Sequence, residues 1–341
     1  MTFRASLACG LCLALLSTLT HAAEKRLDRT FTVQPGGKLT VDTDGSDITV
    51  HGTDANQVTV HIVVTGSQKA LDRLTLSAEP SAEGVAVTTR SSRHDWLDWL
   101  WSGGVRNAKI SVSVPKRYQV GLKTSGGDLQ IEQLQGTATG TTSGGDVRVG
   151  NVDGNVRMRT SGGNIVASDI DGDLHIETSG GDITVRTVTG QLDAETSGGD
   201  IHLEQVQGPA RAHTSSGDIV ADIIRSDADL NSSGGNIKAT VDGRIHAATS
   251  GGNVDVELLG ANRGIEVSTS GGNILLHVPR NVAGVLDAST SGGSVVSDLP
   301  VTTVISSGGH VSRKLNGAIN GGGEPIKART SGGDIQLRAR G

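Results

Sequence analysis

The chain has 341 residues, a formal net charge of −6 and 35% hydrophobic residues, with 49 glycines but only 3 Trp, 2 Phe and 1 Tyr. The near-neutral charge and the aliphatic content exclude a highly charged disordered chain, and the lack of a Gly-X-Y period excludes collagen. The balance of 30 basic and 36 acidic residues predicts no basic surface for nucleic acid.

Residues 1–22 are predicted to be a secretory signal peptide. Arg4 precedes an apolar run from Leu7 to Leu19, and cleavage after Ala22 or Ala23 fits the small residues there. The run is too short for a membrane span, and no other stretch approaches 18 apolar residues. We therefore expect an exported protein, periplasmic or extracellular and at the cell surface, without a transmembrane segment. A buried N-terminal helix is the other interpretation.

Both cysteines, Cys9 and Cys12, lie in this leader. Its removal would leave a mature chain without disulfides, thiol chemistry or a cysteine-ligated metal.

Residues 23–122 are predicted to form an N-terminal β cap. They contain short strand-like runs at 31–33, 39–41, 48–50, 58–64, 85–87 and 110–114. The run from Asp44 to Val50 looks like a decayed copy of the repeat described below. A cap is expected because the end of a stacked β structure exposes unpaired backbone.

All three tryptophans, Trp96, Trp99 and Trp101, fall within this cap region beside Leu97 and Leu100. Such rings can stack on sugars, sit at a membrane interface or contact a partner. The plainer interpretation is a short apolar lid folded over the open end of the stack.

From residue 124 onward a block of Thr-Ser-Gly-Gly-Asp or a close variant returns twelve times. The first seven copies are spaced by 18 residues, and the later gaps are 17, 20, 21, 16 and 24 residues. The copies begin at Thr124, Thr142, Thr160, Thr178, Thr196, Thr214, Ser232, Thr249, Thr269, Thr290, Ser306 and Thr330.

Each unit predicts two short strands and two turns. Aliphatic residues at positions 6 and 8, and again at 15 and 17, alternate with polar residues. This two-residue period is typical of a β-strand. The Ser-Gly-Gly pair is expected to supply positive φ at one turn, and the glycine at position 13 at the other. In the unit that starts at Thr178 the inward residues are Ile183, Val185, Val188, Leu192 and Ala194, with Gly190 at position 13.

We therefore predict an all-β fold for residues 123–341, a single-stack parallel β-helix (β-solenoid) of about 18-residue coils. An antiparallel sandwich is the structural alternative, but it does not require matching residues every 18 positions. The final copy stops at Gly341, so Arg338 and Arg340 are expected to block the exposed edge, unless that end pairs with another subunit.

The repeated Thr-Ser-Gly-Gly-Asp/Asn-Ile-x-Val coils, the Val-x-Val-Pro at Val112 to Pro115 and the leader resemble a bacterial "putative adhesin" family. Its members are β-strand repeat proteins of unknown function. The resemblance covers roughly residues 30–341. It implies an exported β-helical envelope protein for which adhesion is proposed, and it brings no catalytic residues.

The residue after each glycine pair is predicted to form a ladder along the stack. Neighbouring members would lie about 4.8 Å apart, close enough for carboxylates to repel or to share a cation such as calcium. The calcium-binding nonapeptide is absent, so turn bonding is the favoured role. The regular members are Asp128, Asp146, Asn164, Asp182, Asp200 and Asp218.

Catalysis is not expected, and we predict no cofactor. Six histidines fall at six different positions of the repeat, namely 16, 7, 18, 15, 9 and 5, which predicts no stacked file of ligands. These are His175, His202, His213, His246, His277 and His310. No Gly-x-Ser-x-Gly elbow and no His-Glu-x-x-His motif is present.

We therefore expect a non-enzymatic cell-envelope protein that binds a glycan or surface polymer through a repeated polar face. The alternative is a periplasmic scaffold or envelope-stress accessory protein acting through protein contacts. A homo-oligomer fits either function.

Overall fold

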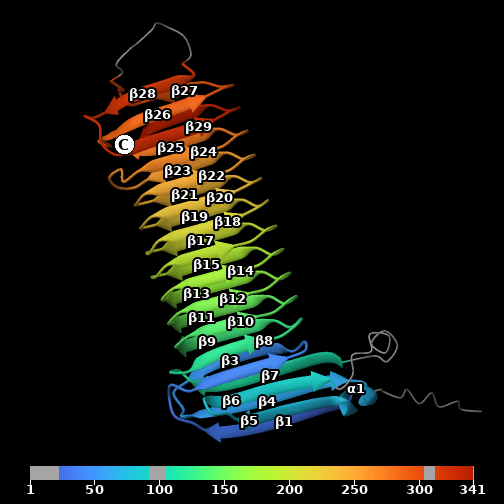
Figure 1. Cartoon of the computed structure of the whole chain (residues 1–341). Helices are drawn as coiled ribbons and strands as arrows, with labels where there is room; N and C mark the ends of the chain where they lie inside the picture. The colour runs from blue at the N-terminus through green and yellow to red at the C-terminus, as the bar shows by residue number, and fades with distance from the viewer. Residues whose placement is uncertain (1–22, 92–104, 303–311, 341) are drawn as a thin grey trace, which may run out of the picture.

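The computed structural model describes residues 23–91, 105–302 and 312–340. They form a rod in which two long sheets face each other (Figure 1). The fold is all-β, and the one helix in this part of the chain is α1 (Gln68–Asp72). No helix in these three ranges has the length and apolarity needed to cross a membrane.

Sheet A has fifteen strands within the described residues. In spatial order they are β1 (Ala23–Thr32), β4 (Gln57–Gly66), β7 (Val105–Pro115), β3 (Asp47–Thr53), β9 (Leu129–Gln135), β11 (Val147–Asp153), β13 (Ile165–Asp171), β15 (Ile183–Val188), β17 (Ile201–Val206), β19 (Ile219–Ile224), β21 (Ile237–Val241), β23 (Val254–Leu258), β25 (Ile274–Pro279), β30 (Ile335–Arg340) and β27 (Val295–Ser297).

Sheet B also has fifteen strands in that part of the chain. From the C-terminal end of the rod they are β28 (Lys314–Ile319), β26 (Gly284–Thr290), β29 (Pro325–Thr330), β24 (Ile265–Ser268), β22 (Ile245–Ala248), β20 (Ala228–Ser232), β18 (Ala210–Thr214), β16 (Leu192–Glu195), β14 (Leu174–Glu177), β12 (Val156–Arg159), β10 (Ala138–Thr141), β8 (Gln119–Lys123), β2 (Lys38–Thr43), β6 (Gly84–Ser91) and β5 (Leu74–Pro80).

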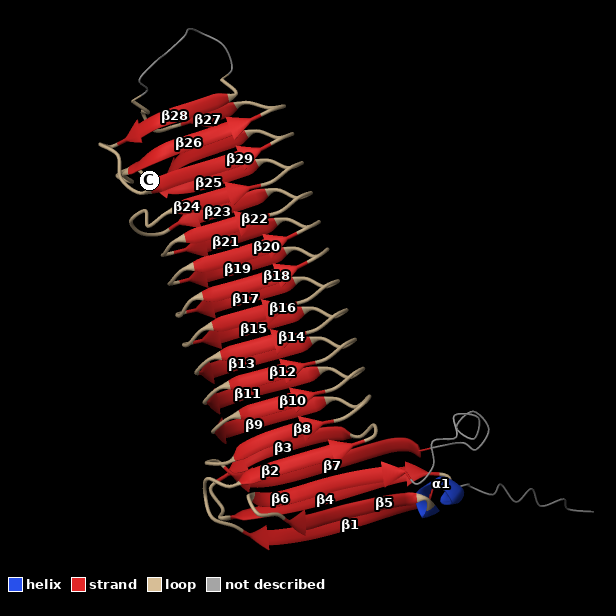
Figure 2. Cartoon of the chain, in the orientation of Figure 1, coloured by secondary structure: helices blue, strands red, loops and turns tan. Residues whose placement is uncertain are grey.

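Each regular repeat contributes one strand to each sheet, and we call a sheet-B strand together with the sheet-A strand that follows it in the chain a rung. Strands of neighbouring rungs run parallel and in register, so that Ile183 pairs with Ile201 and Leu192 with Ala210. This confirms the predicted β-solenoid and shows that the antiparallel sandwich was the wrong alternative. Figure 2 shows the consequence, a stack of strands joined at both edges by short turns.

The predicted alternation of inward and outward residues is confirmed in the regular rungs. The five inward residues predicted for the Thr178 unit are each at most 1% exposed. Small aliphatic side chains fill the narrow space between the two sheets, which leaves little room for aromatic rings.

Tyr118 is the exception in the core, a buried ring near the N-terminal rungs. A Cβ on Gly37 would lie 2.7 Å from the ring and one on Gly84 would lie 2.4 Å from the hydroxyl oxygen, so both positions need glycine. The hydroxyl has no hydrogen-bond partner in the described part of the chain, and desolvation raises the pKa of Tyr118.

At the N-terminal end the chain does not stack in sequence order. β2 and β3 lie between the rung β6/β7 and the rung β8/β9 (Figure 1). The segment from Asp44 to Val50 supplies the turn after β2 and the beginning of β3, and it pairs in register with β9, which confirms its interpretation as a decayed repeat. The strands β1, β4 and β5 pair antiparallel beyond it, and Lys25 of the edge strand β1 donates to the carbonyls of Leu71 and Leu74. An inward lysine on an edge strand discourages further strand addition.

The C-terminal end is also interleaved. β29 and β30 lie between the rung β24/β25 and the rung β26/β27, so that Ile335 pairs with Ile274 on one side and Val295 on the other. The expectation that Arg338 and Arg340 block the terminal edge is therefore wrong, because β30 is an interior strand. Figure 1 places the C-terminus inside the stack, with β28 lying beyond it.

The role expected for the Ser-Gly-Gly pair also needs correction. In the described copies its glycines do not have φ in the left-handed region. At position 13, Gly154 and Gly172 have φ of 144° and 151°, as expected, whereas Gly190 does not have a positive φ in this region. The second glycine of the pair is required for a different reason. A Cβ on Gly181 would lie 2.0 Å from the carbonyl oxygen of Gly163 in the preceding rung, so the close approach of rungs excludes any side chain.

Candidate binding surface

The turns that carry the glycine pairs are cross-linked by a file of buried hydroxyls. The hydroxyl of Thr178 donates to the carbonyl of Gly163 in the preceding rung at 2.9 Å and accepts from the backbone N–H of Gly181 at 3.3 Å. Ser232 makes the same two bonds in its own rung. In the blocks that the structure describes, the hydroxyl of the first residue therefore ties neighbouring rungs together.

The predicted ladder after the glycine pairs is a single file of hydrogen bonds. The backbone N–H of Asp146 donates to Oδ1 of Asp128 at 2.8 Å, and the N–H of Asp200 donates to Oδ1 of Asp182 at 2.9 Å. Asn164 and Asp218 join in the same way. One side-chain oxygen of each of these residues is thus engaged by the next rung, as turn bonding requires.

At the C-terminal end of this ladder, Asp334 accepts from both the backbone N–H of Ser294, at 2.7 Å, and its hydroxyl, at 2.9 Å. The backbone bond and then the hydroxyl bond lower the pKa of the Asp334 carboxyl. Among the described residues no group of three or more His, Cys, Asp or Glu side chains is placed to hold a metal ion.

The tryptophan cluster of Trp96, Trp99 and Trp101 lies outside the described residues. Its predicted contact with a glycan or a partner stays a prediction.

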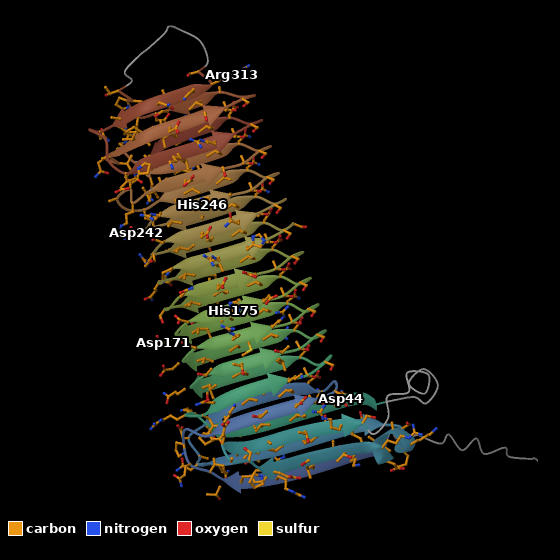
Figure 3. The ribbon with its side chains drawn as sticks, in the orientation of Figure 1. Asp44, Asp171, His175, Asp242, His246 and Arg313 are labelled. Atoms are coloured by element: carbon orange, nitrogen blue, oxygen red, sulfur yellow. The ribbon has the colours of Figure 1, made fainter. Side chains whose placement is uncertain are left out.

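The prediction for the histidines is corrected in one respect. His175 and His246 share one outward file on sheet B, although the repeat numbering placed them at positions 16 and 15. The unit that starts at Ser232 is one residue shorter than the regular units. His246 therefore has a lower repeat number than His175, although the strand pairing places both in the same file. Three rungs separate the two rings, and Figure 3 shows them on the body of the rod, away from Asp171 and Asp242 at the turns.

This outward file, which we call the charged file, carries charged and ionisable side chains along the rod axis, with basic and acidic groups alternating from His175 onward. His175 Nδ1 lies 3.1 Å from Oδ2 of Asp193, and Arg211 Nε lies 3.5 Å from Oδ2 of Asp229. The other oxygen of Asp193 is buried without a hydrogen-bond partner in the described part of the chain. The members are Arg157, His175, Asp193, Arg211, Asp229, His246, Glu266, Lys327 and Asp287.

Three shallow depressions follow the charged file end to end, and together we call them the sheet-B groove. Their volumes are about 330, 330 and 210 Å³. Gln191 lines both of the first two, and Arg244 and His246 line both of the last two. The groove is therefore elongated and parallel to the rod axis, and charged and amide side chains line it, which suits an extended ligand that carries polar groups.

A fourth depression of about 470 Å³ lies at the glycine-pair turns and is lined mainly by Ser and Thr. Sequence reasoning missed all four depressions. Only the register of the strands shows which outward residues share a file. Because the later repeats differ in length, this register cannot be read from a fixed repeat numbering.

Comparison with known proteins gives one family. A model of the family described as Toastrack DUF4097 matches residues 37–241 and 220–338. No curated protein matches the sequence.

Solved structures resemble the chain at low identity. A "putative lipid binding protein" from Parabacteroides distasonis ATCC 8503 is 20% identical over 68% of this chain and 96% of its own, with a TM-score of 0.42. A "putative adhesin" from Bacteroides fragilis NCTC 9343 is 18% identical over 69% of this chain and 97% of its own, with a TM-score of 0.38. The family match alone supports the assignment, and by that match the chain belongs to the Toastrack DUF4097 family.

Proposed function

We propose that this protein is an exported rod of the cell envelope that acts by binding, and that its ligand is a linear glycan or another surface polymer lying along the sheet-B groove. The single observation that carries the proposal is the end-to-end line of depressions beside the charged file. The leader-like residues 1–22 support export.

The repeat explains why a polymer suits this surface. Outward groups recur about every 4.8 Å along the rod, so a chain of similar units can make one weak contact after another. Weak contacts on one ligand add through effective concentration, and affinity then rises with ligand length. A compact metabolite would occupy one depression and gain nothing from the others.

The lining supports a polar ligand. Arginine, histidine and carboxylate side chains line the groove, and these groups hydrogen-bond to sugar hydroxyls and charged substituents. Two pairs of the charged file, His175 with Asp193 and Arg211 with Asp229, join neighbouring rungs, and we take them as contacts that stabilise the stack and not as a catalytic acid and base.

The test is a glycan array followed by titration with fragments of increasing length from each polymer that binds. We expect affinity to rise by about tenfold or more between a fragment that spans one depression and a fragment that spans all three. Affinity that is independent of length would contradict a groove site.

Two further measurements separate this proposal from its alternatives. Substitution of Trp96, Trp99 and Trp101 by alanine tests whether those rings contribute to binding. Protease shaving of intact cells tests exposure at the surface. If no glycan binds and the protein is protected from shaving, a periplasmic scaffold acting through protein contacts becomes the better interpretation.

A further inference from the structure

One depression of the groove lies where the repeat is interrupted. Between Thr249 and Thr269 the spacing grows to 20 residues, and the additional residues lengthen the turn at 259–264. In repeat proteins, insertions of this kind collect on one face and often form the binding face.

Asn262 holds this longer turn in place. Its Oδ1 accepts from the backbone N–H of Gly264 at 3.0 Å, and its Nδ2 donates to the carbonyls of Glu324 at 2.7 Å and Ala283 at 3.2 Å. Three segments distant in sequence are thus fixed together at one point, including the segment that leads into the interleaved strand β29. A fixed turn positions its side chains more accurately than a free loop does.

Arg244 is positioned against the same turn. Its Nε donates to the carbonyl of Arg263 at 3.3 Å, and its stem lies over Gly264, where an added Cβ would sit 3.5 Å from Nε. Gly264 has φ of 115°, a conformation that favours glycine. The guanidinium is therefore held by Nε while its two terminal nitrogens remain available as donors.

Three cationic side chains line this depression of about 210 Å³, namely Arg244, Arg263 and Lys327. Within residues 23–91, 105–302 and 312–340 none of the three lies within 4.0 Å of a carboxylate. Elsewhere on the same sheet Arg159 pairs with Glu177 at 2.9 Å in the next rung. Arg263 of the lengthened turn and its neighbours Arg244 and Lys327 therefore form no ion pair with the described residues of the stack.

Two carboxylates, Glu266 and Glu324, line the same depression. Neither forms an ion pair with a described residue. A carboxylate accepts hydrogen bonds from hydroxyl groups, whereas an arginine fork matches another carboxylate in a bidentate fashion. The combination suits a ligand unit that carries one carboxylate and several hydroxyls.

We propose that this depression binds a carboxylate-bearing sugar unit of the polymer and so anchors the chain in the groove. This inference rests on the proposed function and names the substrate class as an acidic polysaccharide. The carboxylate of the sugar unit lies against Arg244, Arg263 and Lys327, and the hydroxyls of the same unit lie against Glu266 and Glu324. Because the depression is open to solvent, salt weakens the contact.

The experiment titrates the full protein with oligogalacturonate and with its neutral methyl ester. Arg263→Gln and Lys327→Gln remove one charge each, and Arg186→Gln is the matched control, an exposed arginine of β15 on sheet A that also lacks an ion pair in the described part of the chain. We expect about tenfold weaker binding of the acid form for each site variant and less than twofold for the control.

We also expect the methyl ester to bind the unaltered protein as weakly as the acid form binds the double variant. Equal losses for Arg186→Gln and Arg263→Gln, or equal affinity for acid and ester, would overturn the anchor. If the ester binds with length-dependent affinity that no variant changes, the anchor fails while the groove function stands. If neither form binds, the anchor is rejected, and the glycan array decides separately on the groove.

Discussion

The middle of the rod and its two ends are built from the same kind of rung, but they are assembled in different orders. From β8/β9 to β24/β25 each rung stacks on the one that precedes it in the chain. At the ends, β2/β3 and β29/β30 lie between rungs that come from elsewhere in the sequence. The repeat therefore determines how two rungs pair, whereas the connections between strands determine the order in which the rungs stack.

The interleaving gives both terminal repeats two neighbours instead of one. β30 is paired on both sides, and antiparallel strands occupy three of the four outer positions, namely β1, β5 and β28, whereas the short outer strand β27 is parallel. An open parallel edge would offer a template for another strand, so closure by charged antiparallel strands reduces that hazard.

The largest expected loss of stability comes from a substitution in a rung that has a neighbouring rung on both sides, and it should exceed the loss in a rung with one neighbour. Gly181→Ala places a Cβ 2.0 Å from the Gly163 carbonyl, and neither neighbouring rung can move away. We expect a loss of about 3 kcal/mol or more in the free energy of unfolding, measured by urea denaturation.

Two matched variants sharpen this comparison. Gly180→Ala places its Cβ 3.7 Å from the nearest atom and should cost about 1 kcal/mol or less. Gly293→Ala meets the Gly333 carbonyl at 2.3 Å, but its strand β27 pairs only with β30 among the described residues, so it can shift. A Gly293→Ala loss as large as that of Gly181→Ala would argue against the difference between middle and end.

A smaller loss is expected from the buried hydroxyl file. Thr178→Val leaves the Gly163 carbonyl and the Gly181 N–H without their partner, at a cost of about 2 kcal/mol in unfolding free energy. Thr178→Ser keeps both bonds, as Ser232 does naturally, and should cost less than about 1 kcal/mol. Equal urea midpoints for the two variants would show that the hydroxyl is not structural.

The exposed ladder should contribute less than the buried file. Asp200→Ala removes the acceptor of the Asp218 N–H and is expected to cost about 1 kcal/mol by thermal or urea unfolding. Asp200→Asn keeps an oxygen at that place, as Asn164 does, and should be close to neutral. A large loss for Asp200→Asn would instead indicate that the negative charge itself matters.

The smallest effect concerns pH at the C-terminal end of the ladder. Hydrogen bonds from Ser294 lower the pKa of the folded Asp334 carboxyl, so its stabilising contribution is complete above the unfolded pKa of about 3.9 and is lost as pH falls through the lower folded value. Asp334→Asn should therefore flatten the decline in stability below about pH 4. Identical acid unfolding curves for both proteins would contradict the assignment.

The sequence predicts the rung well and the order of rungs poorly. Alternating aliphatic residues and the block at Thr178 sufficed to predict the strands, the parallel register and the buried face. The block at Thr330 begins with the same Thr-Ser-Gly-Gly as both of its spatial neighbours, so its pattern predicts how it pairs but not where in the stack it is inserted. That choice depends on the loops and on β28, whose residues follow no repeat.

The candidate site was harder to predict than the fold. His175 and His246 share a file, but the 17-residue unit that starts at Ser232 displaces them in any fixed numbering. The 20-residue gap that contains Arg263 was visible as an irregularity, whereas its contact with Arg244 and its closeness to Lys327 depend on strands far apart in sequence.

The most direct test of the interleaved stack is a comparison of two cysteine pairs, since residues 23–341 contain no cysteine. His277 and Arg338 are paired across β25 and β30. A stack in sequence order would instead place His277 beside Asp298. After mild oxidation we expect an intramolecular disulfide in His277→Cys/Arg338→Cys, seen by mass spectrometry. We expect none in His277→Cys/Asp298→Cys, because one rung, β29/β30, lies between that pair and keeps the two residues about 9.6 Å apart. A disulfide in the second pair and none in the first would contradict the account.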